Sequence, residues 1–244
     1  MYGILARSPG GATTRLEDIR FRARENALED NLRHWLFEEF RDRIAVSSSF
    51  GTESAVLLHL MARIDRDVPV LFVDTGKLFP ETLAYRDLLV DRLRLTNVRA
   101  VAPEDTDVSR EDPDGTLWSS SHDACCALRK VRPYQQAIRQ FDALITGRKR
   151  VHGAARSDLD LVNVTNGQFR INPLFDWSAE KIGNYLDNFG LPRHPLIAHG
   201  YTSIGCKHCT AKPDGGNSRS GRWSGSGKTE CGIHLSTGWV SLRT

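Results

Sequence analysis

Five cysteines are the residues of this sequence best suited to chemistry, and they fall into two pairs and a single residue. Cys125 and Cys126 are adjacent, Cys206 and Cys209 form a C-x-x-C pair, and Cys231 follows alone. A C-x-x-C pair supplies two thiolates to a soft metal, and a second pair completes a site with four sulfur ligands. The spacing therefore predicts a metal site built from the two pairs, with one thiol left to react.

The adjacent pair favours an iron-sulfur cluster over a zinc ion. Structural zinc sites usually separate their thiols by two to four residues, so neighbours such as Cys125 and Cys126 seldom suit one tetrahedral ion. A cluster distributes its ligands over several iron atoms and tolerates neighbours. A zinc site and a set of buried, unliganded thiols remain the alternatives.

Cationic residues surround the single thiol. Lys228 and His234 flank Cys231, and Arg219 and Arg222 precede it. Positive charge stabilises a thiolate, which is the nucleophilic form of cysteine. We therefore expect Cys231 to be a nucleophile, the alternative being a cysteine without a role.

Two loops are expected at the ends of neighbouring strands. Ser47 to Glu53 lies where a strand ends and a helix begins, so backbone N–H groups and hydroxyls converge on a point that suits an oxyanion. The loop lacks the Gly-Lys-[Ser/Thr] ending of a Walker A motif, so it is not expected to hold a triphosphate in that manner. Asp74-Thr75-Gly76 ends the next strand and faces the same crevice. A Ser-rich structural turn and an Asp that caps a turn are the alternatives.

Strands alternating with helices predict an α/β fold with a mostly parallel sheet flanked by helices. Asn166-Gly167 indicates a type I′ hairpin on the sheet edge. The expected elements, in chain order, are one or two helices over 14–43, a strand over 44–47, a helix over 55–61, a strand over 68–73, a helix over 80–93, a strand over 98–102, a polar loop over 103–121, a helix from the cysteine pair to 141, a strand over 143–146, the hairpin over 160–172 and a capped helix over 178–189.

The chain is expected to divide into a nucleotide-binding domain over 1–200 and a cysteine-bearing segment over 201–244. Pro, Gly and Ser interrupt the second part too often for regular structure, which predicts a mobile tail. No internal repeat is present.

Composition narrows the class of protein. Hydrophobic residues make up 40% and charged residues 26% of 244 residues, and no apolar run is long enough to span a bilayer, so no membrane is expected. A net charge of +3 does not indicate nucleic acid. Basic residues cluster at 148–150 and again at Arg219 and Arg222. Such clusters indicate binding of a small polyanion, the alternative being a solvated surface. An odd number of cysteines in this arrangement favours a reducing compartment over a disulfide framework, and residues 1–12 lack a secretory pattern. We therefore expect the protein in the cytoplasm.

Eight stretches, in order, resemble the assimilatory adenylylsulfate reductases, the iron-sulfur relatives of the phosphoadenylylsulfate reductases in the PP-loop superfamily. The resemblance covers Ser47 to His234. It is carried by SSSFGTES, VDTGKLFPET, DACCALRKVRP, ITGRKR, INPLFDWS, GYTSIGCKHCT, SRSGRW and ECGIH.

The resemblance implies a PP-loop (adenine nucleotide alpha hydrolase-like) fold and an oxidoreductase acting on a sulfur group with a disulfide as acceptor. Adenylyl sulfate would be reduced to sulfite and AMP in sulfate assimilation and cysteine biosynthesis, through a thiosulfonate on Cys231. Thioredoxin or glutaredoxin would be the electron donor. The two cysteine pairs would hold a 4Fe-4S cluster.

Further roles follow from the same resemblance. Lys130 and His234 would act with Cys231 in catalysis, and with Arg219 and Arg222 they would clamp the phosphosulfate. The remaining expected substrate-binding residues are Ser47, Ser48, Ser49, Phe50, Gly51, Thr52, Glu53, Asp74, Thr75, Gly76, Lys77, Arg148, Lys149, Arg150 and Arg156.

Three other functions stay open at this point. The first is a phosphoadenylyl sulfate reductase or a dual-substrate enzyme, because His152-Gly153 replaces the Gln-Ser that often follows the Arg-rich loop of the family. The second is a PP-loop ligase that adenylates an acceptor. The third is a metal-sensing module without catalysis. A homo-oligomer is compatible with the sequence.

Overall fold

The computed structural model describes residues 9–150, 158–213, 215, 219–223, 226 and 228–234, with side chains from Thr14 onward. Arg156 and the His152-Gly153 pair lie outside the described residues.

A six-stranded sheet forms the centre of the described chain, in the order β3-β2-β1-β4-β6-β5. All neighbours pair in parallel except β5 and β6. The predicted mostly parallel α/β fold is confirmed. The strands are β1 (Ile44–Ser48), β2 (Val70–Val73), β3 (Val98–Val101), β4 (Ala143–Thr146), β5 (Val162–Thr165) and β6 (Gln168–Ile171).

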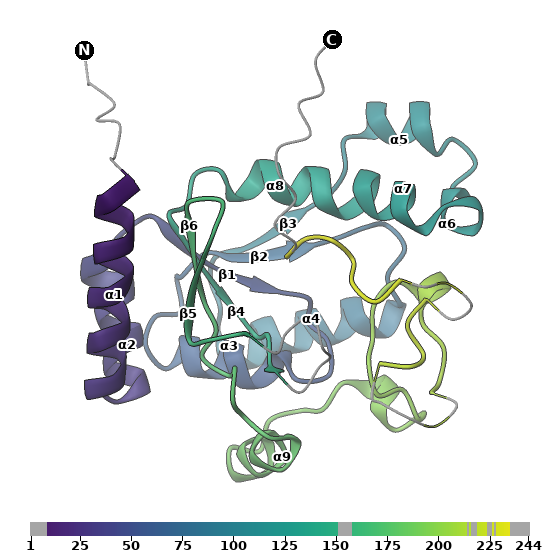
Figure 1. Ribbon diagram of the computed structural model, residues 1–244. Helices are drawn as coiled ribbons and strands as arrows, with labels where there is room; N and C mark the ends of the chain where they lie inside the picture. The colour runs from purple at the N-terminus through teal and green to yellow at the C-terminus, as the bar shows by residue number, and fades with distance from the viewer. Residues whose placement is uncertain are drawn as a thin grey trace.

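Helices cover both faces of the sheet (Figure 1). One face packs against α3 (Ser54–Ala62), α4 (Pro80–Leu93) and α9 (Ala179–Asn188), and the large hydrophobic core lies there. A smaller core on the opposite face includes Ala45, Tyr134 and Leu144 beneath α8 (Arg132–Ile138). The two cores thus bury both faces of the inner strands β1, β2, β4 and β6, whereas β3 and β5 are only partly buried.

The expected hairpin is confirmed at the sheet edge. Asn166 (φ 52°) and Gly167 (φ 74°) both adopt the left-handed conformation that a type I′ turn requires. The outer strand β5 is covered by α1 (Pro9–Glu25), where Arg20 Nε donates to the Val162 carbonyl at 3.0 Å. This contact protects part of an edge that would otherwise leave backbone groups unpaired.

The expected helix pair near the N-terminus consists of α1 and α2 (Leu28–His34), followed by a π-helical turn over Trp35–Glu39. The capped helix is confirmed as α9, because Ser178 Oγ accepts from the Lys181 N–H at 3.1 Å. The second strand begins at Val70 rather than at 68, since Pro69 has no N–H to give to a strand ladder.

The prediction of a loop over 103–121 is wrong, because this segment contains two short helices, α5 (Asp105–Glu111) and α6 (Leu117–Ser120). None of the residues of α5 is buried, so the sequence has no apolar periodicity there. Asp105 and Asp107 stabilise its first turn, where the helix dipole favours negative charge.

The helix that carries the adjacent cysteines is interrupted. It consists of α7 (His122–Cys126), a π-helical turn over Ala127–Val131 and α8, and it ends at Ile138 rather than at 141. Single π turns inside helices commonly occur at functional sites.

The segment after α9 forms only short 3-10 turns, over Pro195–Ile197 and Lys207–Cys209. Its described part packs against the body, since Cys206 forms an isolated β-bridge with Leu78 and Ile204 is buried beside Phe79. The domain boundary at 200 and the mobility of the tail stay predictions.

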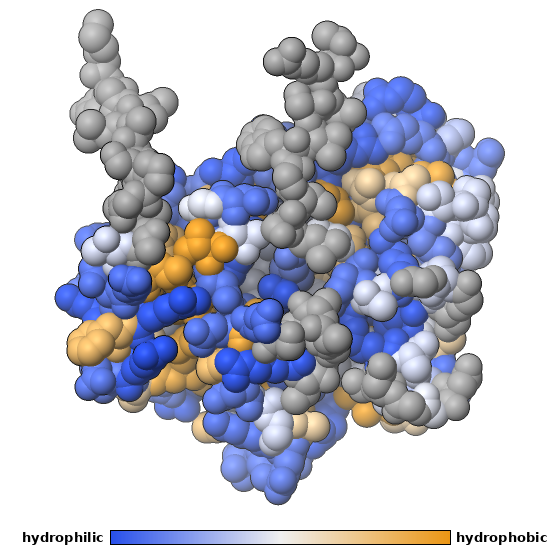
Figure 2. Space-filling view, in the orientation of Figure 1, coloured by the Kyte–Doolittle hydropathy of each residue, from blue (hydrophilic) through white to orange (hydrophobic). Residues whose placement is uncertain are grey.

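The face of the molecule in Figure 2 is mostly hydrophilic, with hydrophobic areas beside α1. None of the helices within the described residues combines the length and the apolar character that crossing a membrane requires.

A buried histidine should make the fold sensitive to acid. His194 Nδ1 accepts from the Leu196 N–H at 3.2 Å, and its Nε2 lies 3.1 Å from Thr82 Oγ1. Burial lowers the pKa of His194 to about 4. The unfolded chain takes up a proton near pH 6.5, so the stability that neutral His194 contributes is present above that pH and lost as the pH falls toward 4, by roughly 3 kcal/mol.

We expect His194→Asn to flatten the fall in the free energy of unfolding between pH 7 and 4.5, measured by urea denaturation. The exposed His199 provides the control, because His199→Asn should keep the wild-type slope. Equal slopes for wild type and His194→Asn would contradict this account.

Candidate active site

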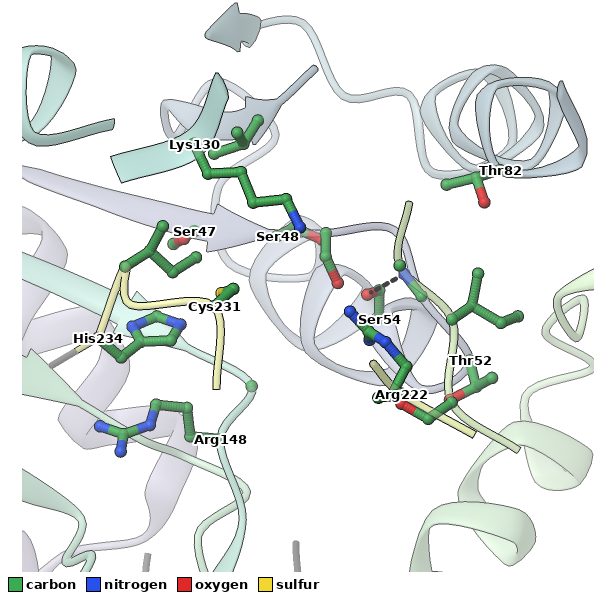
Figure 3. Close-up of a pocket in the computed structure, with 18 of the residues that line it drawn as sticks. Ser47, Ser48, Thr52, Ser54, Thr82, Lys130, Arg148, Arg222, Cys231 and His234 are labelled. Atoms are coloured by element: carbon green, nitrogen blue, oxygen red, sulfur yellow. Dashed lines mark hydrogen bonds between the residues drawn. The ribbon is translucent and has the colours of Figure 1, made fainter. Parts of the chain in front are cut away.

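A cavity of about 240 Å³ lies at the carboxyl ends of β1 and β4, where the loop after β1 meets the tail (Figure 3). Most of the expected site residues line it. They are Ser47, Ser48, Ser49, Gly51, Thr52, Glu53, Thr75, Lys130, Arg148, Arg219, Arg222, Cys231 and His234.

Six expected substrate-binding residues do not line this cavity. They are Phe50, Asp74, Gly76, Lys77, Lys149 and Arg150. Each has a structural partner described below, and their predicted contacts with substrate stay predictions.

The loop after β1 is held from below by Phe50. This residue is fully buried in the left-handed conformation (φ 48°), and its ring meets Phe72 edge-on at 5.3 Å. Its N–H donates to Ser48 Oγ at 3.2 Å, and the Gly51 N–H donates to Ser54 Oγ at 2.9 Å. Two N–H groups of the expected oxyanion site are thus occupied by hydroxyls of the loop itself, while other serines face the cavity.

Lys149 is a buried link between two loops. Only 1% exposed, it donates through Nζ to Glu53 Oε1 at 2.7 Å. The adjacent Arg150 turns away, donating to the Leu159 carbonyl and stacking over the Phe175 ring at 4.7 Å. Of the three neighbouring cations, Arg148 is therefore the one on the cavity wall.

The loop after β2 supports the thiol segment. Asp74 Oδ1 accepts from the Gly76 N–H at 3.0 Å, which is the turn-capping role. Thr75 Oγ1 lies 3.2 Å from Cys206 Sγ. The Lys77 carbonyl accepts from the Lys207 N–H at 2.8 Å, which fixes the start of the C-x-x-C turn.

The four paired cysteines are buried, and none forms a disulfide. Cys206 and Cys209 form a cluster with Trp223, which is 1% exposed and whose backbone N–H donates to the Cys209 carbonyl at 3.1 Å. Cys231 is half-buried at the edge of this cluster. Cys206 and Cys209 also act electrostatically on Cys125, so the two segments that carry the pairs meet near the cavity.

Burial raises the pKa of Cys125 to about 11, and negative charge on Cys126, Cys206 and Cys209 adds to the effect. Burial likewise raises the pKa of Cys126 and of Cys209. Such thiols become thiolates readily only when a bound cation compensates them.

The donor set fits a metal cluster. A four-iron cluster takes one thiolate on each iron atom, and the four buried thiols of the two segments supply that number. Within the described residues, no three His, Cys, Asp or Glu side chains are arranged to hold a metal ion. Whether the cysteines hold such a cluster stays a prediction.

Two cations face these thiols inside the cavity. Lys130, 9% exposed, reaches into the cavity that Cys231 and Arg222 also enter (Figure 3). Burial by itself lowers the pKa of Lys130, whereas the nearby thiols, Cys206 first among them, raise it, and the net shift is upward. Lys130 is thus held in its charged form.

Arg222 is fitted against the backbone of the tail. A Cβ at Gly205 would lie 2.1 Å from Arg222 Nη2, so only glycine permits this approach. Burial lowers the pKa of Arg222, and the thiols, first Cys231, oppose that shift. The cavity therefore combines a thiol with fixed positive charge, the arrangement that suits attack on an anionic, activated sulfur.

Comparison with known proteins identifies the family. Residues 43–212 match the profile of the phosphoadenosine phosphosulfate reductase domain. The chain belongs to this family. A relative named adenosine 5′-phosphosulfate reductase, from Mesorhizobium japonicum, is 49% identical over 84% of this chain and 81% of its own length. Another relative of that name, from Chelativorans sp., is 46% identical over 80% of this chain and 81% of its own length.

A solved structure shares the fold. The crystal structure of phosphoadenylyl-sulfate reductase from Candida auris, a phosphate complex, superposes with a TM-score of 0.68 and 24% identity, covering 86% of this chain and all of that one. The sheet and helices of this reductase family member therefore follow the expected PP-loop arrangement.

Two parts of the reductase site were missed by sequence reasoning. Trp223 covers the C-x-x-C pair, and its only signal was its place beside Arg222. Asp112 forms a buried ion pair with Arg129, with Arg129 Nη2 2.7 Å from Asp112 Oδ2 and side chains 8% and 1% exposed. Arg129 Nη1 also donates to the Thr75 carbonyl at 2.9 Å, so this pair joins the cysteine-bearing helix to the loop after β2.

Neutralising Asp112 should destabilise the reductase. Burial raises the pKa of Asp112, but the hydrogen bond from the Leu117 N–H and the charge of Arg129 together hold this pKa below its usual value. Asp112→Asn leaves a buried guanidinium without a counter-charge, which should lower the free energy of unfolding by about 3 kcal/mol. Urea denaturation at pH 7 measures this.

The exposed Asp114 provides the matched control, and Asp114→Asn should change the stability by less than about 0.5 kcal/mol. Equal stability of the two variants would show that the ion pair does not hold this region.

Proposed function

We propose that this protein reduces adenosine 5′-phosphosulfate to sulfite and AMP, as an oxidoreductase acting on a sulfur group. The observation that carries the proposal is the position of Cys231, on the wall of the cavity that Lys130, Arg222 and His234 also line. The names of the curated relatives support the same substrate.

The residues suggest a division of labour in the first step. The serine hydroxyls of the loop after β1 bind the nucleotide's oxygens, and Lys130 and Arg222 attract the phosphosulfate. The Cys231 thiolate attacks the sulfonyl sulfur, a new S–S bond forms and the S–O bond to phosphate breaks. AMP leaves with that electron pair, so Cys231 carries a thiosulfonate.

The second step requires a dithiol protein, for which thioredoxin or glutaredoxin is our proposal. A donor thiolate attacks Cys231 Sγ, sulfite leaves with the electron pair of the S–S bond, and a mixed disulfide forms. The second donor thiol resolves it. The donor dithiol thus supplies both electrons and restores the Cys231 thiol.

Cys125, Cys126, Cys206 and Cys209 are our proposed ligands of a 4Fe-4S cluster. When bound, the cluster would supply positive iron to the four thiolates and a fixed charge distribution beside the site. Lys130 would connect that charge to the substrate site, because it interacts electrostatically with both Cys206 and Cys231.

A phosphoadenylyl sulfate reductase or a dual-substrate enzyme is the less favoured alternative, since the relatives from Mesorhizobium japonicum and Chelativorans sp. both carry the name of the simpler nucleotide. A ligase and a metal-sensing module are also less favoured, because neither requires a thiol on the cavity wall.

We place the reaction in the cytoplasm, in sulfate assimilation, on the strength of five free cysteines.

Removing the nucleophile should abolish sulfite formation. With adenosine 5′-phosphosulfate and a thioredoxin system, Cys231→Ser should lose at least about 10³-fold in kcat, since serine is a far weaker nucleophile at neutral pH. Without reductant, intact mass spectrometry of the wild type should show a sulfite-sized adduct on Cys231. Turnover with the 3′-phosphorylated nucleotide should be much slower.

The exposed Thr229 lies two residues away, and Thr229→Ser should keep full turnover. Full sulfite output from Cys231→Ser would refute the mechanism, and a preference for the 3′-phosphorylated nucleotide would refute the substrate.

The metal proposal has its own test. Purified protein should be brown and contain about four iron atoms per chain. Cys206→Ser should lose the visible absorbance, whereas Cys231→Ser should keep it. Colourless wild-type protein with stoichiometric zinc would contradict the proposal.

A further inference from the structure

The sheet face beneath α8 changes from apolar to polar near the cavity. Ala45 and Leu144 belong to the small core on this face, and Leu144 is in register with Arg170 on β6. Because side chains alternate along a strand, Ser47 lies on the same face as Ala45, one pleat closer to the cavity that it lines. Tyr134 of α8 packs over this face.

Arg170 and Tyr134 are buried polar groups that the proposed reaction does not yet use. Tyr134 is fully buried and Arg170 is 7% exposed. Among the described residues, no hydrogen bond of full geometry reaches the Tyr134 hydroxyl or Arg170 Nη1, and the side chain that acts on Arg170 is Tyr134 rather than a carboxylate. A buried guanidinium without a carboxylate is costly, so it requires a reason.

Tyr134 lies against the segment that carries Cys231. The Tyr134 ring packs at 6.4 Å against the ring of His234, in an edge-to-face arrangement, and Ile233 packs against the same small core. Burial raises the pKa of Tyr134, while Arg170 and Ser47 lower it, which places both beside the phenol oxygen although neither meets full hydrogen-bond geometry.

The direction of donation in such a row is fixed by chemistry. A guanidinium only donates, so Arg170 donates to the Tyr134 oxygen. The buried phenol proton also needs an acceptor, and Ser47 Oγ is the acceptor beside it. The Ser47 proton is then free to donate into the cavity. An acceptor there, such as a phosphate oxygen, would complete the row.

We propose that Arg170 and Tyr134 are positioning residues that orient the Ser47 hydroxyl as a donor to an oxyanion of the bound nucleotide. This rests on the proposed function, since it requires an anionic adenine nucleotide in the cavity.

The test compares binding of AMP with binding of adenosine, measured calorimetrically on the purified full-length protein. Ser47→Ala should weaken AMP binding about 10-fold, and Tyr134→Phe about 3- to 10-fold, because one hydrogen bond to a charged group is removed or misdirected. Adenosine binding should change less than about 2-fold in both variants. The double variant should bind AMP about as Ser47→Ala does, since Tyr134 acts through Ser47.

Tyr85→Phe is the matched control, because Tyr85 is another buried tyrosine whose hydroxyl donates elsewhere, to the Pro192 carbonyl at 2.7 Å. It should bind AMP like the wild type. Unchanged AMP binding by Tyr134→Phe, equal losses for AMP and adenosine, or additive losses in the double variant would each overturn the inference. A wild type that binds neither AMP nor adenosine 5′-phosphosulfate would instead refute the proposed function and this inference with it.

Discussion

Four buried thiols lie near the ammonium group of Lys130, and the structure depends on keeping these opposite charges together. Burial disfavours the charged form of a thiol and of an amine alike, so each stays ionised only through the other or through a bound cation. The upward shift in the pKa of Lys130 and the upward shift for Cys125 follow from the same neighbourhood. Removing one partner would leave the other in an environment that it cannot tolerate as an ion.

The fold meets this condition by joining segments that are distant in sequence. Cys206 is tied to the loop after β2 by its bridge to Leu78, and Arg129 ties the helix of the adjacent cysteines to the Thr75 carbonyl in the same loop. Both attachments converge on the loop after β2. A loop that the sequence indicated as part of a nucleotide crevice thus serves first as the anchor of the thiol segments.

Local signals in the sequence predicted much of the fold. Asn166-Gly167 determined the hairpin through backbone conformation alone, and Pro80 marked the start of α4. By contrast, α5 buries no residue, so periodicity could not reveal it. The cavity wall was predicted in part. Residue types indicated Cys231 and the family resemblance indicated Lys130, but the burial of Lys149 against Glu53 depends on how two loops pack. No pattern within either loop records that contact.

The hydrogen bond from the Trp223 backbone N–H to the Cys209 carbonyl also limits how far the Cys231 sulfur can lie from the C-x-x-C pair. Seven residues lie between positions 223 and 231, so eight Cα–Cα steps connect them. At about 3.5 Å for each extended residue, this tether is at most roughly 28 Å long. The Cys231 sulfur therefore stays within that distance of the C-x-x-C pair, and in the proposed reaction the thiol of the electron donor has to meet it there.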